Sequence, residues 1–468
     1  MTTTNVKMIL AIDKKGGIGS NASENGMAWH DKEELKIFKQ KTQKCIVICG
    51  SKTASLLPPL LNRTIFCISK RMRNECHQFK YNFVWLFNDI EHAINEAKEL
   101  CNRKIFDGIY VVGGKSIYET CLQHNLIDEV HLSIMKHDYD CDVKIDINLF
   151  KNFTIDTIDE SHETFIHCTL YKHKTDEWQY LELLNKVLAS GNKRETRNGT
   201  TYSIFGHSLM FDLRNGFPLL TTKKMFERGI IEELLFFLRG DTDTKILESK
   251  NVNIWKMNTD RHFLDTHGFE FRKEGMMGPM YGYQWRHYNA EYDETTGKPK
   301  LETGIDQLKQ AIETIKTDKH SRRILMTDYN PLQINLGVLP PCHSIIVQFY
   351  VETTNDIDYI DMTCYNRSQD LFLGTPFNIA SSALLLHIVA KLTNTIPRNM
   401  HLFLGDVHIY EEHLECVKTQ LVRMPYKMPQ LHINKEITSF DDINTLTASD
   451  FKITDYNCHN AIKTQMKA

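Results

Sequence analysis

Several features that would point to particular classes of protein are missing from this 468-residue sequence. Its twelve cysteines include no Cys-x-x-Cys pair, which argues against a zinc site or a dithiol redox motif. No apolar run approaches the ~18 residues of a membrane-spanning helix, and the N-terminal residues lack the apolar core of a signal peptide. The net charge of −3 gives no reason to expect nucleic acid or a membrane surface as a partner. We therefore expect a cytoplasmic protein with free thiols and no bound metal.

What the sequence does contain is typical of a folded globular protein, with 41% hydrophobic and 25% charged residues. A chain of this length can form two or three domains, each with its own core. Strand and helix patterns alternate regularly in the first part of the chain and less regularly in the rest. We expect one domain over residues 1–174, a short junction at residues 175–178 and a second domain over residues 179–468.

The first domain is predicted to be α/β, with a mixed sheet and flanking helices. Short apolar strands alternate with amphipathic helices at residues 32–42 and 89–101, and Asp89 is a suitable N-cap for the second helix. The expected strands cover residues 6–12, 45–49, 64–68, 83–87, 109–112, 129–135 and 165–171, the last as the closing edge strand.

The second domain is predicted to be α+β, because its strands and helices are less regularly interleaved. Residues 289–300 are polar, contain glycine and proline, and are expected to form a surface loop. The expected helices cover residues 178–188, 230–238, 305–317, 379–392 and 411–421, and the expected strands cover residues 324–328, 344–351, 359–365 and 400–404.

The most specific motif is Pro340-Pro341-Cys342-His343, a turn that presents one thiol before a predicted strand. An isolated cysteine is more often a small buried hydrophobic residue. This one is accompanied by Arg322-Arg323 and by the segments 365–370, 374–378 and 406–410, which are rich in side chains that bind nucleotides. Together these motifs resemble the thymidylate synthase family over roughly residues 179–468. The resemblance implies that Cys342 is a nucleophile.

The chemistry of such a site explains the residue types. A thiolate can add to the uracil carbon that lies β to a carbonyl, which makes the neighbouring carbon nucleophilic. The thiol must first lose its proton, and a nearby guanidinium, by resemblance that of Arg367, lowers the thiol pKa. Arginine also suits phosphate oxygens. The residues that match the family's dUMP-binding positions are Arg197, Arg322, Arg323, His343, Arg367, Ser368, Gln369, Asp370, Asn378, His408 and Tyr410.

The resemblance also implies individual roles. In the family, the arginine pair comes from the partner subunit, so Arg322 and Arg323 imply a homodimer formed through this domain. Read alone, two adjacent arginines are more often a solvated pair. The Asn378 amide complements the N3–H and O4 of uracil, which favours dUMP over dCMP.

Proton handling and folate binding complete the second site by resemblance. Glu233 matches the family's catalytic glutamate, which moves protons through ordered water, and Tyr281 matches a further catalytic position. Trp255 and Asn258 match the folate side of the site.

The first domain resembles the dihydrofolate reductase family over most of residues 6–172. Glu34 follows Trp29 by five residues and precedes Phe38 by one helical turn. A buried acid there can hydrogen-bond the pterin and assist protonation of N5 before hydride arrives. Read alone, Lys32-Glu33-Glu34 is a charged helix start that faces solvent. The folate-binding residues that the resemblance implies are Ile9, Ala11, Trp29, Phe38, Arg63 and Ser133, the last as support for the acid.

Three short motifs at residues 50–53, 69–71 and 113–118 suggest NADPH binding. Each follows an apolar strand, where phosphate can meet the N–H groups of a helix start, and their basic residues favour the 2′-phosphate. Ser51 stands where relatives have a basic residue, which we expect to weaken cofactor affinity. The expected cofactor-binding residues are Ile18, Gly19, Gly50, Lys52, Thr53, Ser69, Lys70, Gly113, Gly114, Lys115, Ser116 and Tyr118.

The two resemblances together imply a bifunctional dihydrofolate reductase–thymidylate synthase. Such an enzyme converts dUMP and 5,10-methylenetetrahydrofolate to dTMP and dihydrofolate, and it reduces the dihydrofolate with NADPH. Two alternatives stay open: an N-terminal domain that binds folate without catalysis, and a pyrimidine nucleotide hydroxymethylase, which Asn378 disfavours. Gly114-Lys115-Ser116 also occurs in phosphate loops of nucleotide hydrolases, but the glycine required before it is one position out of place at Gly108.

Overall fold

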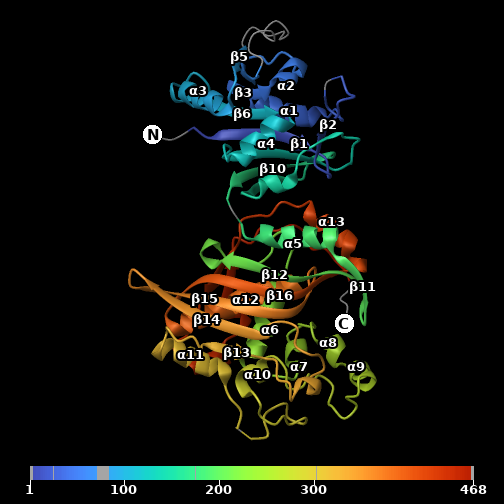
Figure 1. Cartoon of the computed structure of the whole chain (residues 1–468), viewed down its shortest axis with the longest axis vertical. Helices are drawn as coiled ribbons and strands as arrows, with labels where there is room; N and C mark the ends of the chain where they lie inside the picture. The colour runs from blue at the N-terminus through green and yellow to red at the C-terminus, as the bar shows by residue number, and fades with distance from the viewer. Residues whose placement is uncertain (1–3, 25, 71–83, 174, 302, 465–468) are drawn as a thin grey trace. The chain divides into compact units, whose positions relative to one another are not determined.

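The structure is a computed structural model that describes residues 4–24, 26–70, 84–173, 175–301 and 303–464 (Figure 1). The chain divides into two compact units, residues 1–175 and residues 176–468. Residues 177 and 178, expected in the junction, lie in the first turn of α5 (Glu177–Ser190). The N-terminal and C-terminal units each contain their own sheet and are described separately.

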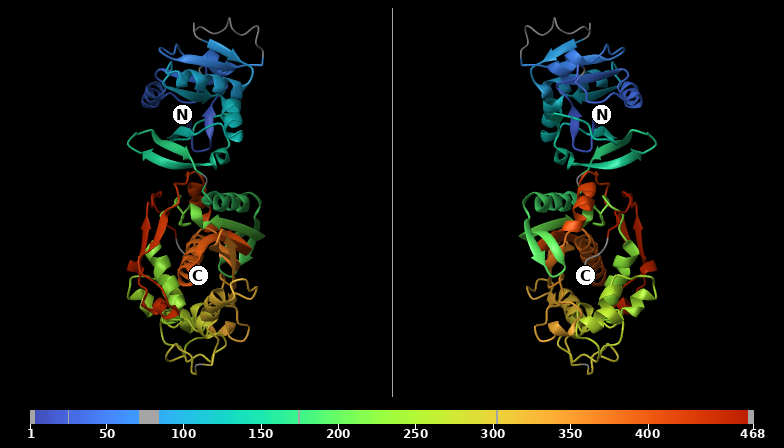
Figure 2. Two further views of the ribbon diagram at one scale, coloured as in Figure 1. Left: turned by 90° about the vertical axis from the view of Figure 1, so that its left-hand side faces the viewer. Right: turned by 90° about the vertical axis from the view of Figure 1, so that its right-hand side faces the viewer.

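The N-terminal unit is built on a mixed sheet. Its neighbouring strands run parallel except at β10, which is antiparallel to both of its neighbours. The central strands β3 and β6 are buried along almost their whole length, as expected for a sheet with helices on both faces (Figure 2). Within the described residues, the strand order is β5 (Val84–Phe87), β4 (Thr64–Ile68), β3 (Cys45–Gly50), β6 (Gly108–Gly113), β1 (Val6–Ile12), β7 (Glu129–Met135), β10 (Phe165–Lys172) and β9 (Phe153–Asp159).

Capping side chains determine where the longer helices of this unit begin. The Asp31 carboxylate accepts hydrogen bonds from the N–H groups of Glu33 and Glu34, and Asp89 accepts one from His92. The helices are α1 (Lys32–Lys41), α2 (Ser51–Leu56), α3 (Ile90–Asn102) and α4 (Lys115–Gln123), and the short strands β2 (Gly17–Gly19) and β8 (Val143–Lys144) pair separately.

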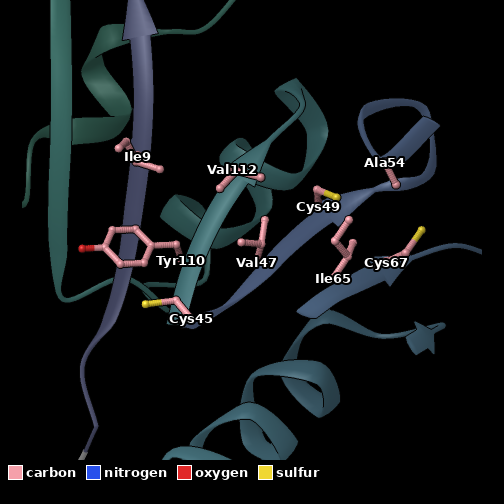
Figure 3. Packing of buried hydrophobic residues seen from close by; sticks show 9 residues of the cluster. All are labelled: Ile9, Cys45, Val47, Cys49, Ala54, Ile65, Cys67, Tyr110 and Val112. Carbon is pink, nitrogen blue, oxygen red and sulfur yellow. The ribbon is translucent and has the colours of Figure 1, made fainter. Parts of the chain in front are cut away.

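A buried apolar cluster lies on the face of the sheet that α1 and α2 cover. Ile9, Val47, Ile65 and Tyr110 come from four adjacent strands and pack side by side (Figure 3). Phe38 of α1 packs against this cluster. The cluster therefore holds α1 against β1, which places Glu34 over the end of the same strand that carries Ala11.

The sheet corrects one prediction. Residues 165–171 were expected to form the edge strand, but β10 pairs with β7 on one side and with β9 on the other. The edge strand is β9, whose second half is largely exposed and polar. An edge strand needs apolar residues on only one face, so β9 lacks the continuous apolar pattern that identified the other strands.

The C-terminal unit contains a second sheet and a larger set of helices. All neighbouring strands of this sheet are antiparallel except β15 and β16, which are parallel. In the part of the chain that the structure describes, its order is β11 (Asn192–Thr196), β12 (Gly199–Asp212), β16 (Ile396–Tyr410), β15 (Ile357–Asp370), β14 (Ile346–Thr354) and β13 (Leu325–Thr327), and β17 (Gln430–Ile433) pairs separately with β18 (Phe451–Thr454).

The helices of this unit confirm the predicted positions, with shifted ends. Residues 289–300 form no helix or strand, as predicted, although Tyr292 is buried and packs edge-on against Tyr283 at 5.1 Å. The remaining helices are α6 (Glu227–Leu238), α7 (Lys245–Glu248), α8 (Lys256–Thr259), α9 (Arg261–Thr266), α10 (Gly282–His287), α11 (Gln307–Thr317), α12 (Gly374–Thr393) and α13 (Leu414–Leu421).

Helix α12 is the central helix of the C-terminal unit. By length and composition it could span a membrane, but 78% of its most apolar window is buried inside the unit, against β15, β16 and α6. It begins five residues earlier than predicted, because Pro376 fits the first turn of a helix, where a missing N–H breaks no hydrogen bond. This earlier start places Asn378 on the helix rather than in a loop.

Candidate active sites

Cys342 lies in the turn before β14 and is held there by contacts to two other segments. Its N–H donates to Tyr281 Oη at 3.2 Å, and the same hydroxyl lies 3.5 Å from Cys342 Sγ. Its carbonyl accepts a hydrogen bond from the Ser368 N–H of β15 at 3.1 Å. The Tyr281 ring stacks on Phe237 on one side and on His343 on the other, with centroid distances of 5.0 and 4.6 Å. The thiol is therefore fixed by a tyrosine whose own position is set by packing.

The electrostatics of the thiol differ from the sequence prediction. Burial raises the pKa of Cys342, while the Tyr281 hydrogen bond and the charge of Arg367 lower it. We expected Arg367 to produce a low thiol pKa. Its effect has the expected sign, and its Nε donates to Pro341 O at 3.2 Å, but desolvation outweighs it. In the free protein the thiol form of Cys342 is therefore favoured.

Asp328 is a residue of this site that the sequence analysis did not identify. It is 1% exposed, directly follows β13, and neither carboxyl oxygen has a hydrogen-bond partner in the described part of the chain. Burial raises its pKa well above the usual value, and its charge raises those of Cys342 and Tyr281. The only signal in the sequence was an acidic residue at the end of an apolar strand, which is common on protein surfaces.

Glu233 is a buried acid on α6, where its neighbours in sequence include Leu234 and Leu235. Trp255 Nε1 donates to its Oε1 at 2.8 Å, and burial raises the Glu233 pKa to about 7. The Trp255 ring contacts the Tyr281 ring at 5.7 Å. Asn258 lies one turn after Trp255, is buried, and has no described partner for its amide nitrogen. The thiol and the acid thus belong to one continuous set of contacts.

Asn378, the candidate for pyrimidine recognition, is oriented by Gln369. Gln369 is 1% exposed, and its Oε1 accepts hydrogen bonds from Asn378 Nδ2 at 3.2 Å and from Thr375 Oγ1 at 3.1 Å. Gln369, which we expected to contact the nucleotide, therefore has its side-chain oxygen bonded to two residues of α12. One N–H of the Asn378 amide is thereby used, which leaves one donor and one acceptor for a ligand.

The sugar-binding candidates lie together on β16. His408 Nδ1 bonds Asp406 Oδ1 at 2.8 Å, which occupies this ring nitrogen. Tyr410 packs edge-on against His408 at 5.3 Å. Burial raises the Tyr410 pKa, and a hydrogen bond from Asn198 and the charge of Arg197 lower it. Asp370, opposite His408 in the sheet, accepts from the N–H groups of Phe372 and Leu373 and so fixes the turn before α12.

The two predicted phosphate-binding arginines of the pair lie apart from these groups. Arg322 and Arg323 are exposed in the turn before β13, and neither forms an ion pair with a residue that the structure describes. Arg367, by contrast, lies beside Cys342 on β15. Most of the predicted site residues of the C-terminal unit therefore lie near one another, whereas Arg322 and Arg323 lie exposed on its surface.

Glu34 is the corresponding buried acid of the N-terminal unit. It is 8% exposed, and Ser133 Oγ of β7 donates to its Oε1 at 3.5 Å. Burial and, less strongly, the charge of Asp31 raise the Glu34 pKa while the Ser133 hydrogen bond lowers it, and the result is a pKa of about 7. Ala11 of β1 lies directly opposite Ser133 in the sheet. The predicted support of the acid by Ser133 is present, and it is long, as catalytic hydrogen bonds often are without substrate.

The remaining folate-side candidates are Trp29 and Arg63. Trp29 is buried, packs on Tyr139 at 5.1 Å, and has no described partner for its Nε1. Arg63 Nη1 donates to Thr42 Oγ1 at 2.9 Å, just past the end of α1. Its buried Nε has no partner among the described residues. Polar groups left unpaired in this way are available to a ligand.

The cofactor candidates form a glycine-lined cradle. Gly50 and Gly114 are the N-caps of α2 and α4, and neither helix has a side-chain cap. A Cβ on Gly114 would lie 3.1 Å from Thr53 Oγ1, and one on Gly113, at φ +104°, would lie 2.8 Å from the Tyr118 ring. Tyr118 is fixed by a 2.9 Å hydrogen bond to Ile9 O. Close backbone approach and open helix N-termini are what a dinucleotide with phosphates requires, so these residues fit NADPH.

The other cofactor candidates lie in α2, α4 and β2 or directly after β4. Lys52 Nζ bonds Asn21 Oδ1 at 2.5 Å, and Lys115 pairs loosely with Glu119 at 3.8 Å. Ser69 follows β4 and is buried, whereas Ser116 and Lys70 are exposed. Gly19 is packed against Gly26 O, and its neighbour Ile18 lies in β2. Arg71, which completes the second motif, lies outside the described residues.

A buried acid and a glycine-lined cradle in one unit, and a buried acid linked by contacts to a fixed thiol in the other, are typical of an enzyme with two sites. Comparison with known proteins agrees. The family model described as dihydrofolate reductase matches residues 5–173, and the one described as thymidylate synthase matches residues 178–468.

Full-length relatives have the same order of units. The chain is 38% identical to the bifunctional dihydrofolate reductase-thymidylate synthase of Paramecium tetraurelia, with 100% of both chains covered. It is 32% identical to that of Zea mays, covering 99% of this chain and 96% of the relative. It is also 45% identical to human thymidylate synthase over 62% of this chain and 90% of the relative.

The chain belongs to the bifunctional dihydrofolate reductase–thymidylate synthase family. It is an oxidoreductase and a methyltransferase of nucleotide biosynthesis, and it uses NADPH and 5,10-methylenetetrahydrofolate. The family assignment confirms both resemblances, the predicted order of an α/β and an α+β unit, and the two predicted activities.

Ionisation of the buried Glu233 should lower the free energy of unfolding of the C-terminal unit by a measurable amount. Glu233→Gln should stabilise this unit at pH 8 by roughly 1–3 kcal/mol and by much less at pH 5. The folded pKa of about 7 lies above the unfolded value, so the stability present at low pH is lost as the pH rises through 7. A neutral amide avoids this loss and can still accept from Trp255. Thermal unfolding at the two pH values measures the difference.

Glu232→Gln is the matched control for this prediction. Glu232 precedes Glu233 on α6 and pairs with Lys250 at 2.6 Å. Its amide variant loses that ion pair and should gain no stability at pH 8. Equal behaviour of the two variants would show that desolvation of Glu233 is not the cause.

Proposed function

We propose that Cys342 is the nucleophile of dTMP synthesis and that Glu233 handles the protons of the same reaction. The observation that carries this proposal is the continuous contact from Cys342 Sγ through Tyr281 and Trp255 to Glu233. An acid with a pKa of about 7 can both take and return a proton near neutral pH. The contacts supply a thiol and such an acid within one site.

The proposed reaction follows from the chemistry of the uracil ring. The Cys342 thiolate adds to the carbon β to a carbonyl and makes the neighbouring carbon nucleophilic. That carbon takes the methylene group of 5,10-methylenetetrahydrofolate. The folate also supplies the reducing equivalents that convert methylene to methyl, so it leaves as dihydrofolate. Release of dTMP breaks the bond to sulfur, and Glu233 exchanges the protons through water.

Base recognition is assigned to Asn378. With one N–H held by Gln369, the amide presents its oxygen to the uracil N3–H and its second N–H to O4. Cytosine offers the reverse pattern, so dUMP is the preferred nucleotide. His408 and Tyr410 are assigned to the sugar, and Arg197, Arg367 and Ser368 to the phosphate.

The active assembly is proposed to be a homodimer through the second sheet. The outer face of this sheet exposes large apolar side chains, among them Tyr350 (59%), Phe403 (47%) and Tyr365 (37%). An apolar face of this kind is typical of a protein–protein interface. Arg322 and Arg323 stand exposed at the β13 end of the same sheet. A second copy of the chain would cover the apolar face and could receive these arginines at its phosphate site.

Glu34 is proposed as the acid of dihydrofolate reduction. Its carboxyl group hydrogen-bonds the pterin and assists protonation of N5, while Ile9, Ala11 and Phe38 line the folate side. NADPH, when bound, supplies hydride. The backbone of Gly113 and Gly114 and the first turn of α4 would hold its phosphates, and Lys52 and Lys70 are available for the 2′-phosphate.

Replacement of the nucleophile tests the first assignment. Cys342→Ser should lower dTMP formation by more than about 10³-fold, because a serine hydroxyl does not ionise near neutral pH. NADPH-dependent reduction of dihydrofolate should be retained. A 5-fluorinated dUMP analogue with 5,10-methylenetetrahydrofolate should trap a covalent adduct on Cys342, which peptide mass spectrometry locates. An adduct on another residue would overturn the assignment.

Mixing two inactive variants tests the dimer. Arg322→Ala and Cys342→Ser subunits combine into dimers with one complete site, made of an intact Cys342 and an intact Arg322 from the other chain. If half of the dimers are mixed, about a quarter of wild-type synthase activity should return at low dUMP. Labelled subunits confirm exchange. No recovery despite exchange would mean that Arg322 acts within its own chain.

Replacement of the reductase acid tests the N-terminal assignment. Glu34→Gln should lower dihydrofolate reduction by about 10²–10⁴-fold and leave NADPH affinity unchanged, because the amide cannot handle a proton. In the wild type, activity should fall as the pH rises through about 7, where Glu34 loses its proton. Stopped-flow oxidation of NADPH and fluorescence titration of the cofactor measure the two effects. Full activity of the variant across pH would exclude Glu34 as the acid.

A further inference from the structure

Ser133 lies between Glu34 and a histidine that the reaction, as described so far, does not use. His167 of β10 is directly opposite Ser133 in the sheet, and its Nδ1 lies 3.2 Å from Ser133 Oγ. The same hydroxyl is 3.5 Å from Glu34 Oε1. Ser133 itself is 1% exposed. A buried chain of hydrogen-bonding groups thus runs from the acid through a hydroxyl to an imidazole.

The surroundings of His167 decide which nitrogen carries its proton. Nε2 is buried and has no hydrogen-bond partner among the residues that the structure describes. A buried N–H without an acceptor is rarer in proteins than a buried acceptor without a donor. The proton of the neutral ring therefore belongs on Nδ1, which donates it to Ser133 Oγ. The hydroxyl proton of Ser133 is then directed to Glu34.

The charged groups around His167 keep it neutral. Burial lowers the His167 pKa to about 4, and His131, Lys41 and His162 act in the same direction, while Asp159 opposes them. The His131 ring stacks on His167 at 5.9 Å and is itself bound to Glu129 at 2.8 Å. Asp31 is the charged neighbour of Glu34 at the start of α1. His167 therefore stays neutral over the pH range in which Glu34 titrates.

We propose that His167 is a positioning residue of the reductase site, which acts through Ser133 to set the pH at which Glu34 gives up its proton. The inference rests on the proposed role of Glu34. While Nδ1–H occupies a lone pair of Ser133, the hydroxyl is held as a donor to Glu34, and such a donor favours the carboxylate form. Without His167 the hydroxyl is free to rotate, and Glu34 keeps its proton to a higher pH.

The test is the pH profile of kcat/KM for dihydrofolate at saturating NADPH, which reports titration in the free enzyme. His167→Phe keeps a ring against His131 and removes Nδ1. In this variant, the pH at which kcat/KM falls (the falling limb of the profile) should rise by about 0.5–1 pH unit, the effect expected for one weakened hydrogen bond. His167→Asn places an amide N–H near the position of Nδ1 and should restore the wild-type limb.

Two further variants separate positioning from a general effect on packing. Thr169→Val changes the same strand and face, at a hydroxyl that lies 3.5 Å from His131 Nδ1, and should not move the limb. Ser133→Ala with His167→Phe should show the limb of Ser133→Ala alone, because His167 acts through that hydroxyl. An unmoved limb in His167→Phe, or additive shifts in the double variant, would overturn the proposal.

Glu34→Gln distinguishes failure of this inference from failure of the proposed function. If that variant is inactive while His167→Phe leaves the limb in place, only the role of His167 is wrong. If Glu34→Gln keeps the falling limb near pH 7, Glu34 is not the acid, and both proposals fail.

Discussion

Burial of a carboxyl group with too few donors to replace its water is the physical constraint on which both sites depend. Glu34 and Glu233 are each 8% exposed, and each accepts one hydrogen bond from a described side chain, Ser133 or Trp255. Glu177 is buried more deeply but accepts four, from the N–H and hydroxyl groups of Thr221 and Thr222. The four donors tie α5 to Thr221 and Thr222, and burial still raises the Glu177 pKa, as it raises those of Glu34 and Glu233. The packing of α1 and α6 therefore serves chemistry as well as stability.

A second constraint comes from β15 of the C-terminal sheet, because this one strand carries residues of both the candidate site and the proposed interface. β15 carries Cys364 and Asn366 inward, toward Ser344 and the turn of Cys342, while Tyr365 and Arg367 alternate to the exposed side. The period of two along a strand makes this arrangement unavoidable. A substitution that shifted the register of β15 would move the nucleotide-binding residues and the apolar outer face together. Assembly and catalysis are thus coupled through the backbone of one strand.

The sequence was most informative where chemistry or apolar pattern is local. The Cys342 turn, Glu34 one turn before Phe38, and strands such as β1 and β7 could be predicted because neighbouring residues carry the signal. β12 was not predicted, since its alternation of buried and exposed positions mixes Ser203 and Thr201 with exposed Phe205. Asp328 and His167 were missed for a different reason. Their surroundings come from strands far apart in sequence, and an acid after β13 or a histidine in β10 has no meaning until Cys342 or Ser133 is beside it.

Cys342 shows how the same desolvation can control when a site is reactive. Burial favours its thiol form in the free protein, and only the thiolate is a strong nucleophile or is readily oxidised. Low reactivity while the site is empty would protect Cys342, the proposed nucleophile of dTMP synthesis, from oxidation. Ionisation then has to accompany substrate binding, and Tyr281 Oη, in contact with both Sγ and the backbone N–H, is positioned to stabilise the developing anion. The reactive form of the thiol is thereby confined to the complex.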